Sequence, residues 1–406
     1  MTDWIDWGFG IHPCRGRLID APYINRLPLE EKSLAGALKE GGYNTWHVGK
    51  WHLGGAPYLP EHHGFDVNVG GCHWGCPING YFSPYGIPGL EDGPEGEYLT
   101  DRLTDEAIQL IENNRGKPFF LNMWYYTVHT PIQAKPEYIE MFKARARAMG
   151  LNRIDPFQEG EFFPCEHKKD QRVVRRLVQS DPVYAAMVFS LDENIGRLLD
   201  ALERTDQAEN TVVIFTSDNG GLATAEGSPT SNAPLSEGKG WMYEGGTREP
   251  LIIKWPGVIE PHSTCSVPVT SPDFYPTLLE ITGLELMPAQ HADGTSLVPL
   301  LKRTGDLERA IFWHYPHYGN QGGTPGASVR EGDCKLIEFF EDGHVELYNL
   351  REDPGEKHDL SEEEPQRADE LRETLAKWRQ EVEAKMPQPN PDFVPWRESD
   401  VSAPWV

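Results

Sequence analysis

Basic residues are scarce in this chain of 406 residues: 37 Lys and Arg stand against 63 Asp and Glu, which gives a formal net charge of −26. An excess of this sign repels phosphate backbones, so general nucleic-acid binding is disfavoured unless a basic face is concealed in the fold. No run of about 18 apolar residues occurs, so the sequence predicts no membrane-spanning helix. The six cysteines are too sparse for the dense disulfide framework of a small secreted domain.

The first residues, MTDWIDWGFGIHPCRGR, are acidic and aromatic and include no basic stretch followed by an apolar run. They therefore show no signal peptide, and taken literally this places the chain in the cytoplasm. The redox state of the cysteines stays open. Cys72 and Cys76 flank His73, but no second Cys/His pair stands at zinc spacing, so a disulfide or two free thiols are the favoured interpretations.

Hydrophobic residues make up 38% of the chain, which is enough for a sizeable core. Apolar spacing predicts helices over 29–41, 101–112 and 182–203 and strands over 43–48, 118–126, 211–216 and 251–254. Alternating helices and strands indicate an α/β fold with a largely parallel sheet. The charged, irregular stretch 144–181 is typical of an inserted loop that shapes substrate access.

The pattern changes near residue 306. Short alternating strands are expected over 310–315, 328–330, 335–339 and 345–349, followed by a charged amphipathic helix over 362–385. This predicts a smaller antiparallel sheet with one helix packed on it. We therefore divide the chain into an α/β domain, 1–305, and a C-terminal α+β subdomain, 306–406, whose last residues wrap the surface.

Polar side chains follow the predicted strands at their carboxyl ends, where α/β proteins bind ligands. Lys50 and His52 follow the first strand and point the same way in extended chain. His129 follows the second strand. Asp218 and Asn219 follow the third and offer the oxygen ligands of a hard cation such as calcium or magnesium.

A further cation, Lys239, lies in a glycine-rich loop. Each of these residues also has an ordinary interpretation, because a lysine at a strand end is often solvated and Asp-Asn-Gly-Gly favours turns. Because these residues occur together at successive strand ends, a shared functional role is favoured over the ordinary interpretation. Together they predict a site for a divalent ion and a tetrahedral oxyanion such as sulfate or phosphate.

Several segments match a known family in order and approximate spacing. They are GKWHLG at 49–54, HGFD at 63–66, HTP at 129–131, TSDNGG at 216–221, GK at 238–239 and EGGTREP at 244–250, with KLI at 335–337 and ELYNL at 346–350. Taken together they resemble the type I, formylglycine-dependent sulfatases of the alkaline phosphatase superfamily. The resemblance covers nearly the whole chain and implies an alkaline-phosphatase-like α/β fold with helices flanking the sheet.

The resemblance also implies a role for each residue. Asp218 and Asn219 would ligate calcium, and Lys50 and Lys239 would bind sulfate oxygens. His129 would protonate the leaving alcohol, while His52 would hold the catalytic aldehyde hydrate and help to release sulfate. Fixed cations and a proton donor are what cleavage of a sulfate ester requires.

Two parts of the family pattern have no counterpart in this sequence. The formylglycine precursor motif, Cys/Ser-x-Pro-x-Arg, is absent, because Cys14 is followed by Gly16 and Leu18 where Pro and Arg belong. Asp3 and Asp6 are not the adjacent aspartates that complete the family's calcium site. We therefore expect an N-terminally truncated sulfatase with weak calcium affinity, no appreciable turnover, an unpaired sheet edge and low solubility.

Sulfated carbohydrate is the expected substrate, with aryl sulfates as model substrates. His314 and His317 lie in an aromatic segment that could line a sugar subsite, or equally form a buried strand end. A phosphoryl-transfer enzyme of the same superfamily and a non-catalytic anion- or glycan-binding relative remain as alternatives. Such sulfatases are usually periplasmic or secreted, which leaves the location open.

Overall fold

The computed structural model describes residues 16–114 and 116–394, and this part of the chain alternates helices with strands. The α-helices are α1 (Leu34–Glu40), α2 (Leu99–Asn113), α3 (Pro136–Ala148), α4 (Pro182–Arg204), α5 (Glu244–Thr247), α6 (Phe274–Thr282), α7 (Val298–Leu301) and α8 (Pro365–Glu381). The strands are β1 (Leu18–Ile19), β2 (Asn44–Gly49), β3 (Val67–Val69), β4 (Phe119–Trp124), β5 (Phe157–Phe162), β6 (Arg172–Arg176), β7 (Val213–Thr216), β8 (Leu251–Lys254), β9 (Ala310–Tyr315), β10 (Gly326–Glu331), β11 (Cys334–Phe339), β12 (Val345–Asn349) and β13 (Gln388–Pro389).

Two sheets of the α/β half bear on the site. In the first, β2 lies between β3 and β4 and runs parallel to both, with Trp46 opposite Leu121. The second is the antiparallel pair β7–β8, with Ile214 opposite Ile253. Among the described residues β4 pairs only with β2 and β7 only with β8, so both are edge strands. Because every open sheet has edge strands, the unpaired edge expected from a missing strand stays a prediction.

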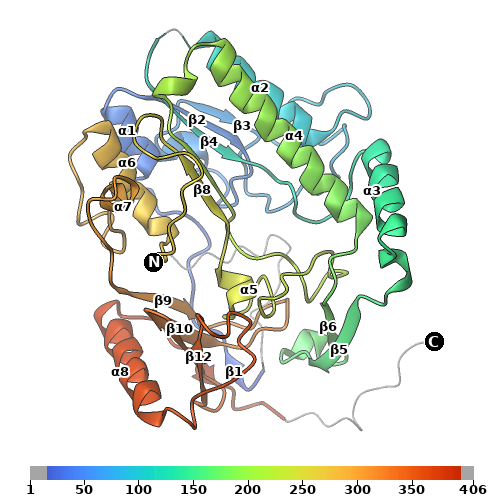
Figure 1. The fold of residues 1–406 in the computed structure, drawn as a ribbon, viewed down its shortest axis with the longest axis vertical. Coiled ribbons are helices and arrows are strands. Elements are labelled where there is room, and N and C mark those ends of the chain that lie inside the picture. Colours follow the sequence, from blue (N-terminus) through green and yellow to red (C-terminus); the bar gives the residue numbers. More distant parts are fainter. Residues whose placement is uncertain (1–15, 115, 395–406) are drawn as a thin grey trace.

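Helices cover both faces of the β2–β4 sheet (Figure 1). Successive strand residues point to opposite faces, and the neighbours Phe119 and Phe120 illustrate this. Phe119 packs in a cluster with Ile111 of α2 and Leu202 of α4, whereas Phe120 packs in another with Ala35 of α1. The predicted α/β class, with helices on the two sides of a parallel sheet, is therefore confirmed.

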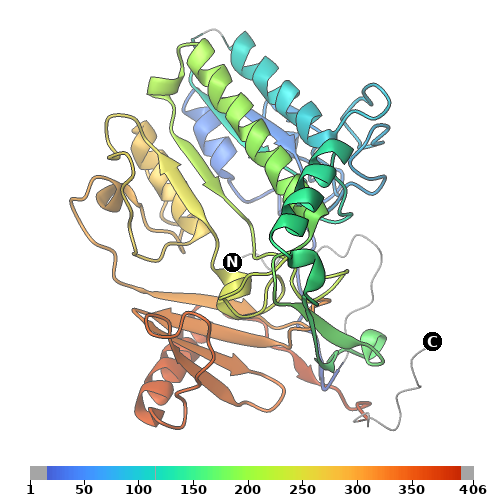
Figure 2. The same cartoon turned by 45° about the vertical axis from the view of Figure 1, so that its right-hand side comes forward.

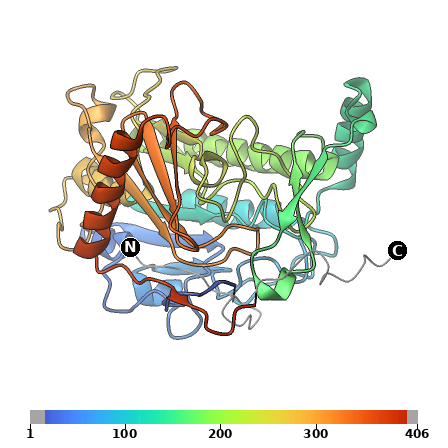
Figure 3. The ribbon, with the colours of Figure 1, turned by 90° about the horizontal axis from the view of Figure 1, so that it is seen from below.

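The C-terminal sheet is antiparallel in the order β12-β11-β10-β9. One face buries Leu336 and Leu347 against Leu371 and Leu375 of α8, which lies along the sheet in Figures 1 and 3. The other face, which includes Ile337, packs with Met242. This sheet therefore contacts the chain just before α5, and the predicted small sheet with one helix is confirmed.

The segment 144–181 is more regular than the sequence indicated. It contains the end of α3 and the antiparallel hairpin β5–β6, and Figure 2 shows α3 leading into this hairpin on the side away from α6. No residue of α3 is fully buried, although Tyr138, Ile139 and Phe142 pack against the core beside α4, so its apolar face is short and only partly covered. None of the helices described is long and apolar enough to cross a membrane. The domain division at residue 305 stays a prediction.

Candidate active site

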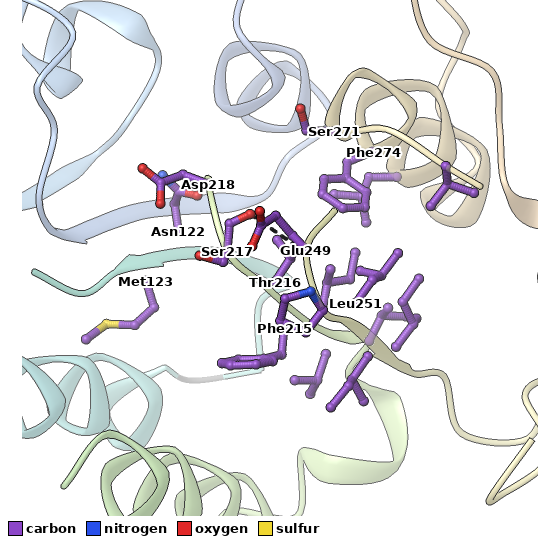
Figure 4. A pocket seen from close by; sticks show the side chains of 18 of the residues that line it. Asn122, Met123, Phe215, Thr216, Ser217, Asp218, Glu249, Leu251, Ser271 and Phe274 are labelled. Atoms are coloured by element: carbon purple, nitrogen blue, oxygen red, sulfur yellow. Dashed lines mark hydrogen bonds between the residues drawn. The ribbon is translucent and has the colours of Figure 1, made fainter. Parts of the chain in front are cut away.

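The strand-end residues named from the sequence line one cavity of about 3170 Å³ that extends between β4 and the β7–β8 pair. Figure 4 shows side chains of the lining from β4, among them Asn122 and Met123, and from the segment Phe215 to Asp218. The predicted residues in its lining are Lys50, His52, His129, Asp218, Asn219 and Lys239. Of these six, Lys50, His129, Asp218 and Lys239 are also close enough to act on one another electrostatically.

Lys50 is held where β2 ends beside β4. Its amide donates to the Trp124 carbonyl over 2.7 Å. Gly49, directly before it, has φ of 104°, and a Cβ there would lie 2.0 Å from the Trp124 oxygen, so only glycine permits this close approach. His52 has φ of 61°, and its ring lies against Gly75, where an added Cβ would come within 2.5 Å of Cε1.

His129 and Lys239 are in direct contact, with 3.2 Å between Nε2 and Nζ. The other ring nitrogen, Nδ1, lies 3.0 Å from the Thr130 carbonyl, which can only accept a hydrogen bond. Nδ1 therefore carries the proton, and Nε2 accepts from the Lys239 ammonium. Burial, Lys239 and Lys50 together lower the pKa of His129 to about 4.

Lys50 shares this electrostatic environment. Burial lowers the pKa of its ammonium, the positive charge of Lys239 lowers it further, and Asp218 and Cys76 oppose both effects. Two ammonium groups close enough to disfavour each other's charge are stabilised when an anion binds between them. Cys76, which the sequence offered only for a disulfide, a free thiol or a zinc site, influences Lys50 without being one of the residues that line the cavity.

Close backbone packing holds the loop that contains Asp218 against the loop that contains Lys239. The Lys239 amide donates to the Gly221 carbonyl over 3.2 Å. The Asn232 side chain joins the two loops, donating to the Gly221 and Glu237 carbonyls over 2.8 Å each and accepting from the Gly221 amide. Asn232 stands in a polar, proline-containing stretch with no periodic signal, and sequence reasoning missed it.

Asp218 and Asn219 are the only two residues here that the sequence assigned to a metal. Calcium takes six to eight oxygen ligands. Within residues 16–114 and 116–394 no group of three or more His, Cys, Asp or Glu side chains could hold a metal ion. The residues present therefore do not fit a complete calcium site. Cys14, Asp3 and Asp6 lie outside the described residues.

Glu249 is a second carboxyl near Asp218 that the sequence did not indicate. It lies beside Ser217 in Figure 4, at the start of β8. Burial and the negative charge of Asp218 raise the pKa of Glu249 to about 7. The charge of Asp218 therefore acts on Glu249 as well as on Lys50 and His129.

His314 and His317 are not brought to this cavity. His314 belongs to β9, and its Nε2 lies 2.8 Å from the Lys385 carbonyl, close to Phe340 and Trp378. His317 is 2% exposed and packs edge-on against Tyr23 and Tyr315. Both rings pack inside the C-terminal half, which is the alternative that the sequence had left open.

Family profiles match most of the chain. The one described as Sulfatase matches residues 15–284, and the one described as N-sulphoglucosamine sulphohydrolase, C-terminal, matches residues 237–385. A sulfatase of Formosa agariphila is 36% identical over 297 residues, which cover 68% of this chain and 48% of that protein. An N-acetylglucosamine-6-O-sulfatase of Bacteroides thetaiotaomicron is 27% identical, covering 82% and 69%, and human arylsulfatase A is 29% identical, covering 82% and 68%.

Solved structures show the same fold. The crystal structure of Ps i-CgsB in complex with k-i-k-neocarrahexaose superposes with a TM-score of 0.68 at 27% identity, covering 89% of this chain and 77% of that one. The chain spans about half the length of the Formosa agariphila relative and more of the others. With the profile match, the relatives and the strand-end residues in agreement, the chain belongs to the sulfatase family and has its alkaline-phosphatase-like fold.

Proposed function

We propose that this chain acts on sulfate esters of carbohydrates, with Lys50 and Lys239 binding the sulfate group and His129 serving as the proton donor. The observation that carries the proposal is the contact of Lys239 with His129 in a cavity that Lys50 also lines. A cation pair beside a histidine suits a group that has anionic oxygens and a leaving oxygen.

The contacts suggest an order of events. Without substrate, Lys239 donates to Nε2 of His129 and, with Lys50 and burial, keeps the ring neutral. Anionic sulfate oxygens would draw both ammonium groups to themselves and offset their charge. The pKa of His129 would then rise, so that Nε2 could take up a proton and deliver it to the leaving oxygen. His52, in the same cavity, is proposed as the second acid–base group.

Calcium and formylglycine are what membership of the family implies, and neither enters these steps. Asp218 and Asn219 are proposed as calcium ligands, but they supply two of the six to eight oxygens that the ion needs. A measurement of calcium affinity on this chain should therefore give weak binding. The roles proposed for Lys50, Lys239 and His129 do not depend on that result.

Relatives support carbohydrate as the carrier of the sulfate. One is named an N-acetylglucosamine-6-O-sulfatase, and one solved structure holds k-i-k-neocarrahexaose. The net charge of −26 supports the absence of nucleic-acid partners.

Sulfate binding measured by isothermal titration calorimetry tests the proposal. Lys50→Met and Lys239→Met should each weaken sulfate binding roughly tenfold or more, because each removes a charge-assisted hydrogen bond. Lys377→Met is the matched control, since the Lys377 side chain is 73% exposed on α8. Equal affinity in all four proteins would overturn the proposal. Binding without turnover of an aryl sulfate is the result expected for this sequence, because it has no formylglycine precursor motif. A preference for phosphate esters would favour the phosphoryl-transfer alternative.

A further inference from the structure

A buried lysine of the C-terminal sheet forms ion pairs with two glutamates of other segments. Lys335 of β11 is completely buried. Its Nζ lies 2.9 Å from Oε1 of Glu244 and 3.0 Å from Oε1 of Glu356, and 3.4 Å from the Thr247 hydroxyl. Burying an ammonium group is costly unless it is paired and hydrogen-bonded. These partners therefore fix where Glu244 lies.

Glu244 is the first residue of α5, and its backbone is held as well. Its amide donates to Oε2 of Glu356 over 2.6 Å. Arg330 and Arg248 approach the remaining oxygen, Oε2, at 3.7 and 3.8 Å. The start of α5 is thus held at two points. The Glu244 side chain pairs with Lys335, and the Glu244 amide donates to Glu356, which also pairs with Lys335.

The glycines of α5 lie between the two loops of the candidate site. A Cβ at Gly220, two residues after Asp218, would meet the Gly245 oxygen at 1.7 Å. A Cβ at Gly246 would meet the Gly238 oxygen at 2.5 Å, next to Lys239. The Gly245 amide donates to the Ser236 carbonyl over 2.8 Å. A displacement of α5 would therefore move both loops.

We propose that Lys335 is a positioning residue for the anion site, acting through Glu244 and α5 to hold Lys239 against His129. The proposal rests on the proposed function for its role in sulfate binding, but the placement of Lys239 can be measured without it. A side chain of the C-terminal sheet thereby contributes to a site that otherwise belongs to the α/β half.

Lys335→Met tests this role, because methionine keeps much of the length and removes the charge. The matched control is Arg309→Met, which breaks another ion pair, with the fully buried Asp273, and whose described partners belong neither to α5 nor to the loop that contains Lys239. Both variants should lose stability, since each leaves a buried carboxylate uncompensated. A stability measurement therefore does not distinguish the two variants. Only Lys335→Met should release Lys239 from His129, and this requires a local measurement.

The first readout is the NMR titration of His129. In Lys335→Met its pKa should rise from the depressed value towards that of an ordinary histidine, because the Lys239 ammonium is no longer held beside the ring. In Arg309→Met it should stay depressed. The second readout is hydrogen exchange, in which protection of residues 236–239 should fall roughly tenfold or more in Lys335→Met alone.

Glu244→Gln keeps the argument testable if Lys335→Met does not fold, because glutamine preserves the shape and can accept from Nζ. It should shift the His129 titration in the same direction by a smaller amount. An unchanged His129 pKa and unchanged protection in Lys335→Met, or in Glu244→Gln if the former is unfolded, would overturn the positioning role. If the wild-type protein bound no sulfate, the proposed function would fail, and these two readouts would still decide the inference.

Discussion

The two halves of the molecule differ in how completely their strands are covered. In the C-terminal sheet, β10 and β11 have neighbours on both edges, and their central residues are buried. In the α/β half, β4 and the β7–β8 pair border the large cavity, and their residues are mostly half-buried or exposed. The candidate active site lies on the less covered half and is held in part by the better covered one, through Lys335.

Two isoleucines make the contrast concrete. Ile337 of β11 is completely buried, whereas Ile252 of β8 is 64% exposed. Both stand in short apolar strands with the same residue preferences. Isoleucine therefore suits the strand conformation equally at both positions, and the two positions differ in how far the side chain is buried. We expect stability to come mainly from the C-terminal half and the flanking helices.

The largest expected effect is on the C-terminal core. Leu347→Ala removes a side chain that is 1% exposed between β11 and α8, and should lower the free energy of unfolding by about 2–5 kcal/mol. Leu121→Ala on β4, where the side chain is half-buried beside the cavity, should cost clearly less. Chemical denaturation measures both. Equal losses would show that the two halves are equally well packed.

A second test uses acid. Burial, with a smaller contribution from His314, lowers the pKa of His317 to about 4, below the value of 6.5 in an unfolded chain. The unfolded state therefore binds more protons between these values, so the contribution of His317 to stability is full above pH 6.5 and is lost as the pH falls towards 4. His317→Phe should remove on the order of 2 kcal/mol of this pH dependence. His358→Asn, at a side chain that is 66% exposed, is the control and should leave the profile unchanged.

The smallest effect on stability is expected at the cavity edge. Ile252→Thr replaces an apolar group that already meets solvent, so the free energy of unfolding should change by about 0.5 kcal/mol or less. Solubility should rise, because less apolar surface lies next to an unpaired strand edge. Ile337→Thr, at the buried position, should instead destabilise strongly. Light scattering and denaturation measure the two outcomes, and a large loss of stability at Ile252 would contradict the contrast.

The sequence predicted elements well where apolar periodicity was strong. The strand 251–254 matches β8 in its bounds, the strand 310–315 matches β9, and the helix 182–203 corresponds to α4, which ends one residue later. It did not predict α3, whose apolar face is limited to a few partly buried residues such as Tyr138, Ile139 and Phe142. It also did not predict that β7 and β8 are antiparallel, since the orientation of a strand depends on partners that periodicity does not specify.

For the site, the sequence identified residues that follow strands. Lys50 and His129 follow β2 and β4, whose carboxyl ends lie at one edge of the parallel sheet, and Asp218 follows β7 of the separate antiparallel pair. It placed His314 and His317 in a possible sugar subsite, whereas the fold packs them inside the C-terminal half. Asn232 and Glu249 were missed, because their roles arise only from loop packing and from the proximity of Asp218. The position of a residue after a strand indicated which chemical groups the site could contain. The tertiary structure determines which of these side chains lie in the same site.

The most direct test of the central claim is a crystal structure of this chain with tungstate, a tetrahedral oxyanion that anomalous scattering locates without ambiguity. The account predicts one tungstate in the cavity with oxygens within hydrogen-bond distance of Nζ of both Lys50 and Lys239, and the contact between Lys239 and His129 opened. Tungstate bound elsewhere, or a cavity without it at concentrations that saturate other sites, would contradict the assignment of an oxyanion site to these residues.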